Sequence, residues 1–286
     1  MTDRASQHIA IDPGRERQRW DQSGPFWDRW ADAMADPADR INRPLLERLD
    51  LQPGHRLLDL AAGAGEPALT AASLVGPDGL VLATDLAPAM LTGARRRAGS
   101  TAPLVFGAAD MTRLPFADAS MDRVSCRLGL MFVPDDRQAV EEMRRVLRPG
   151  GRAVVAVWGP RADNTLFAEL GRVVARHLGP DADQALEVLF RHADPGRTAD
   201  LFRQAGFSDV SETAVLTDAA TRLDRPFWRP ALEMVFGPLL QGLPMVIRQQ
   251  IDTDIVRAFA RLAGSDGKIY LRMHARLAAA ITPTSV

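Results

Sequence analysis

Two acids and the small-residue turn between them are the positions of this chain best suited to chemistry. Asp59 lies inside the apolar run 56–61, the turn 62–65 (AGAG) follows at once, and Asp85 stands at the carboxyl end of the run 80–83. Small residues permit positive φ angles and let a ligand approach the backbone closely. Because open parallel sheets bind ligands at the carboxyl ends of their strands, we expect these residues at one ligand site.

The turn also fits a motif that two cofactors share. Residues 63–68 have the GxGxxA spacing, and Asp85 lies twenty residues beyond the second glycine (65 to 85), which matches the dinucleotide fingerprint. The motif alone does not separate NAD from S-adenosylmethionine (SAM). A pyrophosphate needs backbone N–H donors and a positive helix N-terminus, whereas Glu66 places an anion there and Pro67 removes a donor. SAM, which carries a sulfonium and an amino group and no phosphate, fits better.

Four stretches carry a resemblance to a known family: LLDLAAGAGEPAL, VLATDLAPAML, AADMTRLPFADASMDRVSCRLGLMFVPD and MRRVLRPGGRAVVAVWG. Over about residues 45–160 the chain resembles class I SAM-dependent methyltransferases. It is most similar to the branch that contains the ubiquinone/menaquinone C-methyltransferases (UbiE-like) and many natural-product methyltransferases. Ala64 departs from the family pattern, because Thr or Ser is frequent there. The resemblance implies SAM as cofactor and S-adenosylhomocysteine as product.

The resemblance also implies which residues contact SAM. Asp59 organises the glycine loop and the methionine amino group, Asp85 accepts from both ribose hydroxyls, and Asp110 with Met111 clamps the adenine. The remaining expected cofactor contacts are Ala61, Gly63 and Gly65 in the loop and Leu86 and Met90 against the adenine.

Each of these positions has a structural alternative. Asp59 is otherwise a carboxylate bonded to loop N–H groups, because an unpaired charge inside an apolar strand is costly. Asp85 is otherwise the N-cap of a helix starting at Pro88, and Asp110 otherwise caps its own turn. For Leu86 and Met90 the alternative is ordinary packing in a helix core.

Arg127 excludes several classes of methyltransferase. Enzymes that methylate amino groups of adenine or glutamine place an [N/D]PPY motif at this strand end, and a guanidinium has no acceptor for the amine. No aspartate stands near it for the metal of a catechol-type enzyme, and the scattered histidines lack metal-ligand spacing, so we expect no metal. Arg127 is left to contact the SAM carboxylate or an anionic acceptor, or to form a salt bridge at the sheet edge.

General-base candidates are few. His177 and His192 lie in the acceptor half, and each is either a base or a surface residue. We expect His274 to be solvated on the polar face of the last strand. We expect Cys126, the single cysteine, to be a small buried hydrophobe, and the run 95–97 (RRR) to be a solvated helix face.

The composition excludes several partners and locations. The chain has 286 residues, with 35 basic and 36 acidic side chains, so no concentrated basic surface suggests nucleic acid. No apolar run has the length of a membrane span, and the N-terminus lacks the apolar region of a signal peptide. With one cysteine, these features predict a cytoplasmic protein without membrane partners. The oligomeric state stays open, a homo-oligomer included.

Alternating elements predict the fold. Buried strands are expected at 56–61, 80–83, 104–108, 122–126 and 152–158, with helices between them, which indicates a doubly wound parallel sheet. Beyond this region we expect a helix at 164–178, a loop at 179–195, a helix at 197–205 and a strand at 210–216. The alternation in 268–277 predicts a half-exposed strand. The resemblance implies that 206–216 and 268–281 form an antiparallel hairpin that completes a seven-stranded Rossmann-like sheet.

Two helical additions complete the predicted organisation. Residues 1–19 are polar and expected to be frayed, and an aromatic helix follows. Its Trp27 and Trp30 either pack on the core or belong to a lid over SAM and acceptor. The segment 221–264, with Trp228 and Phe236, reads as two helices of an acceptor cap. The predicted parts are a lid (1–50), a SAM-binding core (51–220), the cap insertion (221–264) and the last strand (265–286).

Together these features predict a methyltransferase that acts on a small, fairly apolar acceptor, aromatic, terpenoid or polyketide-like, at carbon or oxygen. Two alternatives stay open. The same fold can hold SAM as a non-donating ligand, since fold does not fix function, and an NAD-dependent oxidoreductase is the other.

Overall fold

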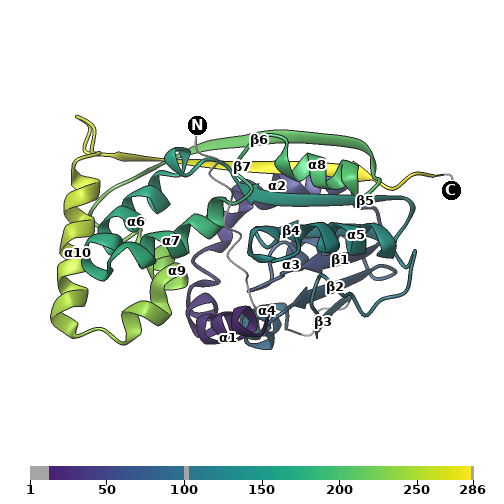
Figure 1. Cartoon of the computed structure of the whole chain (residues 1–286), viewed down its shortest axis with the longest axis horizontal. Helices are drawn as coiled ribbons and strands as arrows, with labels where there is room; N and C mark the ends of the chain where they lie inside the picture. The colour runs from purple at the N-terminus through teal and green to yellow at the C-terminus, as the bar shows by residue number, and fades with distance from the viewer. Residues whose placement is uncertain (1–12, 100–102, 285–286) are drawn as a thin grey trace, which may run out of the picture.

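The computed structural model describes residues 13–99 and 103–284 (Figure 1). The first helix, α1 (Pro13–Trp30), begins earlier than expected. The prediction that residues 1–19 are frayed is therefore wrong for 13–19, and residues 1–12 lie outside the described residues. The polar side chains at the start of α1 are held by local contacts, because Arg19 pairs with Glu16 at 2.7 Å and lies over the ring of Trp20.

The seven strands form one sheet in the order β3-β2-β1-β4-β5-β7-β6. The strands β1 to β5 are parallel, and β7 is antiparallel to both β5 and β6. This confirms the predicted doubly wound sheet with a terminal hairpin. The strands are β1 (Arg56–Leu60), β2 (Leu80–Asp85), β3 (Leu104–Ala108), β4 (Met121–Arg127), β5 (Leu147–Trp158), β6 (Ser208–Thr221) and β7 (Ile269–Ile281).

Helices cover both faces of the sheet, as the alternating pattern predicts. The helix α2 begins at Ala35, and its Ile41, Leu45 and Leu49 are buried. It packs against β4, β5 and the terminal hairpin. The N-cap Asp135 of α5 accepts a hydrogen bond from the Gln138 backbone N–H. The covering helices are α2 (Ala35–Leu49), α3 (Ala68–Val75), α4 (Leu91–Ala98), α5 (Asp136–Val146) and α8 (Arg197–Gln204).

A separate group of helices lies at the far end of the long strands β6 and β7 (Figure 1). Two of them, α9 (Arg229–Gln241) and α10 (Met245–Ala260), are inserted between these strands, and the other two, α6 (Thr165–Leu178) and α7 (Pro180–Glu187), follow β5. We call the inserted pair the cap. The strand β6, which leads into the cap, is longer than the predicted strand 210–216, because its pairing with β7 continues to Thr221.

The segment 179–195 is not the loop that the sequence suggested. It contains α7 and a 3₁₀ turn, Val188–Phe190, and the side chains of Leu186, Leu189 and Phe190 are buried. The charged residues at 181, 183 and 187 hide the helical pattern. Two of them, Asp183 and Glu187, form ion pairs with Arg161, so tertiary contacts support this helix where its periodicity is weak.

Candidate functional site

The site begins where β1 and β4 end side by side. Ala61 (φ 53°) and Leu128 (φ 56°), which each directly follow one of these strands, are in the left-handed region. For residues with a side chain this conformation costs roughly 1–2 kcal/mol, and such outliers concentrate at ligand sites. The next residue after Leu128 is Gly129, and a Cβ there would collide with Ala61, so the two turns are in close contact.

Asp85 holds the glycine loop from the end of β2. Its Oδ2 accepts from the Gly63 backbone N–H at 3.0 Å, and its Oδ1 accepts from the Ala87 N–H at 3.1 Å. Burial raises the pKa of Asp85 to about 6. The turn-capping alternative is thus present, through Ala87, but the same carboxylate also reaches the loop. It stands at the sheet edge where a ribose would bind.

Asp59 and Arg127 contribute buried polar atoms that lack partners. Asp59 Oδ1 accepts from the Ser125 hydroxyl at 2.6 Å, not from loop N–H groups, while its Oδ2 and the Nε of Arg127 have no hydrogen-bond partner among the described residues. Burial raises the pKa of Asp59 to about 7 and lowers the pKa of Arg127. No salt bridge of Arg127 occurs in the described part of the chain, so the sheet-edge ion pair is not found there. A carboxylate with one unsatisfied oxygen and a guanidinium with an unsatisfied Nε suit the ammonium and carboxylate of the methionine part of SAM.

The expected adenine residues lie around the same loop. The Met90 methyl is 3.6 Å from the position of a Cβ on Gly63, and the Met111 methyl is 3.7 Å from that of a Cβ on Gly129. Asp110 Oδ1 accepts from the backbone N–H and the hydroxyl of Thr112, at 2.9 and 2.7 Å. Its turn-capping alternative is therefore present, and its second oxygen is not engaged by these bonds. Leu86, next to Asp85, is half-buried.

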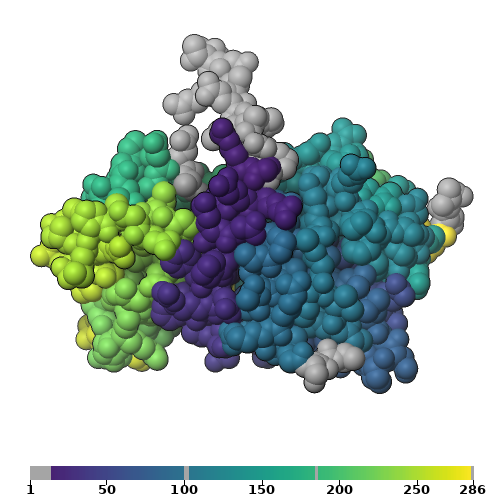
Figure 2. Space-filling model, turned by 90° about the horizontal axis from the view of Figure 1, so that it is seen from below, coloured from purple at the N-terminus to yellow at the C-terminus, as the bar shows by residue number. Residues whose placement is uncertain are grey.

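The helix α1 crosses from the cofactor side of the molecule to the cap. Figure 2 shows its purple surface between the green and yellow cap and the blue-to-teal half. Trp20 meets the ring of Phe132, just beyond β4, at 4.8 Å between centroids, and the Trp30 indole N–H donates to Glu233 of α9 at 2.8 Å. Trp27 packs on Trp20 at 6.1 Å between centroids, and its buried indole nitrogen has no hydrogen-bond partner within the described part of the chain.

The cap residues named from the sequence do not line an open surface. Trp228 is 4% exposed and Phe236 1% exposed, and Trp228 stacks on Phe259 of α10 at 6.2 Å. They form the core of the cap, because aromatic residues at helical spacing serve a core and a pocket equally well.

The histidines are not solvated surface residues. His192 is 0% exposed, with Nε2 3.2 Å from Asp136 Oδ2, so the surface alternative is wrong for it. Burial lowers the pKa of His192. His177 Nε2 lies 3.0 Å from Asp254 of α10. These contacts place neither histidine at the glycine loop.

His274, expected in solvent, is also buried. Its Nδ1 lies 3.0 Å from Asp163, and its ring packs against Gly159 just after β5. Cys126 is buried as predicted, and burial raises the pKa of its thiol to about 12. No group of metal-binding side chains occurs among the described residues.

Sequence reasoning missed Trp20 with Phe132 as neighbours, and it misread Arg97. The side chain of Arg97 is only 13% exposed and pairs with Glu66 at 2.9 Å, so this arginine is not part of a solvated face. The charge of Glu66 is thus compensated, which weakens the electrostatic argument against a pyrophosphate. Pro67 still removes a donor. The last arginine of the run 95–97 gives no signal of such a contact in the sequence, because its partner Glu66 lies 31 residues away in the turn before α3.

Comparisons with known proteins decide the cofactor. A family profile described as "Methyltransferase domain" matches residues 58–155. A demethylmenaquinone methyltransferase from Beutenbergia cavernae is 34% identical over 213 residues, which cover 70% of this chain and 85% of that protein. Methyltransferase GfsG from Streptomyces halstedii is 38% identical over 128 residues, 44% of this chain and 45% of that protein. The solved [4+2]-cyclase SpnF shares the fold, with a TM-score of 0.62, 19% identity and coverage of 97% of this chain and 98% of that one.

The fold and the matched motifs define a SAM-dependent methyltransferase. The chain belongs to the class I SAM-dependent methyltransferases of the ubiquinone/menaquinone C-methyltransferase (UbiE-like) type. SAM is its cofactor, which excludes the alternative of an NAD-dependent oxidoreductase. Within residues 13–99 and 103–284, no helix combines the length and apolar character that crossing a bilayer requires.

Proposed function

We propose that the enzyme transfers the SAM methyl group to a small, fairly apolar acceptor bound between the end of β4, α1 and the cap. The observation that supports this most is the aromatic wall of Trp20, Trp27 and Phe132 beside the strand end. Aromatic side chains present large apolar surface with few polar groups. The demethylmenaquinone methyltransferase relatives, whose names state an acceptor with a ring system, are compatible with the same class.

In this proposal Asp85 receives the ribose, Asp110 and Met111 the adenine, and Asp59 and Arg127 the methionine ammonium and carboxylate. Methyl transfer from a sulfonium is an in-line displacement, and the thioether leaves without an acid. The chain's main contribution is then alignment, which supplies up to about 7–11 kcal/mol, and exclusion of water by α1 and the cap. A phenol or acidic carbon acceptor also needs a base, and we assign none.

A screen for S-adenosylhomocysteine formation tests the proposed acceptor class. We expect turnover with phenolic, quinol, terpenoid or polyketide-like acceptors and little with free amino acids, because charged acceptors lose hydration in an apolar site. The reactions should contain EDTA and proceed unchanged. If only highly polar acceptors react, the acceptor class is wrong. SAM binding without any S-adenosylhomocysteine across the panel would instead support SAM as a non-donating ligand.

Replacing Asp59 by asparagine should stabilise the free protein and weaken SAM binding. Burial raises the pKa of Asp59 to about 7, above the unfolded value near 3.9. The folded state therefore binds more protons between these values, and the free energy of unfolding falls as the pH rises from about 4 to about 7. Above pH 7 the variant avoids a buried anion, and we expect a gain of about 1–3 kcal/mol.

Thermal unfolding at pH 5 and pH 8, with SAM calorimetry at pH 8, checks this prediction. The gain in melting temperature should be larger at pH 8, and SAM affinity should fall because the ammonium loses its anion. The Ser125→Ala variant is the control, since it removes the partner of Asp59 Oδ1 without removing the charge. Unchanged SAM affinity in Asp59→Asn would remove Asp59 from the cofactor site.

A further inference from the structure

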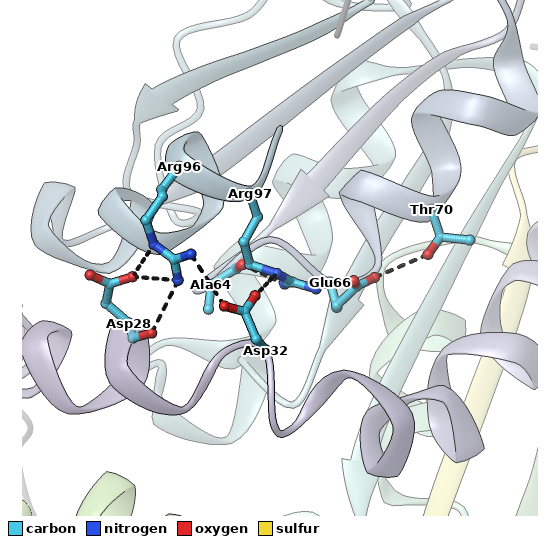
Figure 3. Close-up of polar contacts among 7 residues, drawn as sticks. All are labelled: Asp28, Asp32, Ala64, Glu66, Thr70, Arg96 and Arg97. Carbon is cyan, nitrogen blue, oxygen red and sulfur yellow. Dashed lines mark hydrogen bonds and ion pairs between the residues drawn. The ribbon is translucent and has the colours of Figure 1, made fainter. Parts of the chain in front are cut away.

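Arg97, in the last turn of α4, connects the glycine loop with the residues that follow α1 (Figure 3). Its Nη1 donates to the Ala64 carbonyl oxygen at 2.9 Å, and its Nη2 donates to Glu66 Oε1 at 2.9 Å. Its Nε lies 3.2 Å from Asp32 Oδ1, just beyond the end of α1. One guanidinium thus uses three nitrogens on two separate segments, as its rigid fork permits.

The two ends of this connection differ in burial. The side chains of Arg97 and Glu66 are 13% and 15% exposed, whereas that of Asp32 is 67% exposed. Exposed ion pairs contribute little, with a median of about 0–1 kcal/mol, so the contact with Asp32 is the weak one. The contacts with the loop are shielded, and removal of the guanidinium would leave Glu66 without its ion-pair partner and with only the Thr70 hydroxyl, 3.1 Å from its Oε2.

Arg97 and Asp85 hold the same loop from opposite ends. Asp85 accepts from the Gly63 N–H, and Arg97 donates to the carbonyl oxygen of the next residue, Ala64. Gly63 (φ 51°) and Gly65 (φ 111°) flank that residue in conformations that other residues rarely adopt. Glycine gives such a loop much freedom in the unbound state, so fixing its peptide planes before the cofactor arrives lowers the ordering cost of binding.

The neighbouring Arg96 adds a surface connection between α4 and the lid helix. It contacts Asp28 at 3.1 Å and Asp32 at 3.2 Å, but its side chain is 51% exposed. A close helix contact lies beside it, because a Cβ on Gly93 would come within 2.8 Å of Asp28. The packing of α1 on α4 therefore depends on close contact as well as on charge, and Arg97 links it to the glycine loop through hydrogen bonds.

We propose that Arg97 is a positioning residue for SAM. The Arg97 guanidinium orders the glycine loop and couples that order to the packing of α1 on α4. The proposal relies on SAM as the cofactor and is independent of the acceptor. Binding of SAM to the loop then stabilises the Arg97 contacts, including the one with Asp32, and slows opening of α1. Because such coupling is reciprocal, loosening α1 at Asp32 also weakens SAM binding, and the loss is small while α1 stays mostly closed.

Calorimetry with SAM alone separates this role from general stabilisation. We expect Arg97→Ala to bind SAM at least 10-fold more weakly and Arg97→Lys to be intermediate, since lysine keeps the charge but not the fork. The matched control is Arg95→Ala on the same helix. Arg95 is exposed and lies over the Phe106 ring at 5.7 Å, so this variant has the same change in charge and should bind within twofold of the parent.

Hydrogen exchange of residues 13–32, with and without saturating SAM, tests the coupling. SAM should slow this exchange in the parent protein and in Arg95→Ala. SAM should slow the exchange less in Asp32→Asn, whose SAM affinity stays within about threefold of the parent. In Arg97→Ala, SAM should not slow the exchange at all.

Parental SAM affinity in Arg97→Ala overturns the positioning role, and identical α1 exchange with and without SAM in the parent overturns the coupling. If Arg97→Ala does not fold, SAM affinity and the exchange of α1 are measured in Arg97→Lys and Arg97→Gln instead. Because no acceptor is present, failure here leaves the proposed methyl transfer untouched.

Discussion

Replacement of Asp85 by alanine should weaken SAM binding by about 1.5–3 kcal/mol, which corresponds to roughly 10- to 150-fold in Kd. The carboxylate is proposed to accept from the ribose hydroxyls, and hydrogen bonds to a charged group have this magnitude. It also accepts from the Gly63 N–H at 3.0 Å, so the variant loses a support of the glycine loop as well. Calorimetry with SAM and with S-adenosylhomocysteine should show the same loss, because the two ligands share the ribose.

The same strand offers a control for this measurement. Asp78 is exposed in the turn before β2, at the opposite end from Asp85, and Asp78→Ala should leave SAM binding unchanged. Unchanged affinity in Asp85→Ala would exclude Asp85 from the cofactor site.

The pH dependence gives a second comparison. Burial raises the pKa of Asp85 to about 6, and the ribose hydroxyls donate best to the ionised form. SAM affinity should therefore fall as the pH drops through 6, and Asp85→Asn should lose that part of the dependence.

A variant that lacks residues 1–34, which removes α1 and keeps α2, should lose at least about 100-fold in turnover while it remains folded, since small misplacements in a site cost that much. The helix α1 packs on α4, on the turn Pro88–Met90 that follows β2, and on α9. A Cβ on Gly24 would lie 3.0 Å from Ala89, and one on Gly237 would lie 2.7 Å from the Phe26 ring. These contacts place α1 between the turn after β2 and the cap, where we propose that it closes over the cofactor and excludes water.

The alternative, that α1 is only a stabilising helix, predicts a different pattern. The melting temperature would then fall, but turnover per folded molecule would stay at the parental value. Far-UV circular dichroism and thermal unfolding measure the folded fraction, and an acceptor from the screen provides the rate. We restrict the lid proposal to α1, because α2 is buried against the sheet and belongs to the core.

A point variant tests the lid with less disturbance. Trp20→Ala removes the contact with Phe132 and should lower turnover, whereas Trp20→Phe keeps an aromatic ring there and should retain most of it. Equal rates in Trp20→Ala and the parent protein would argue against closure at this point.

The sequence alone determined the sheet and the cofactor. Buried parallel strands are short apolar runs, glycine turns have characteristic residues, and both signals are local, so β1 to β4 were predicted within about two residues. The strand β5 begins at Leu147, five residues before the expected 152 (152 − 147). The acids Asp59 and Asp85 were found because a charge next to a buried strand is rare without a function. The motifs indicated SAM through their resemblance to a family, and the comparisons with known proteins decided it.

Tertiary structure decided what depends on partners distant in the sequence. Arg97 reads as a surface residue until the loop at 64–66 and Asp32 are placed beside it. Trp228 reads as a pocket residue until Phe259 of α10 stacks on it, and Phe236 reads as one although it is buried. His192 and His274 read as exposed until Asp136 and Asp163 meet them. Periodicity reports that a side chain faces something apolar or polar, but only packing determines whether that neighbour is solvent, a ligand or another helix.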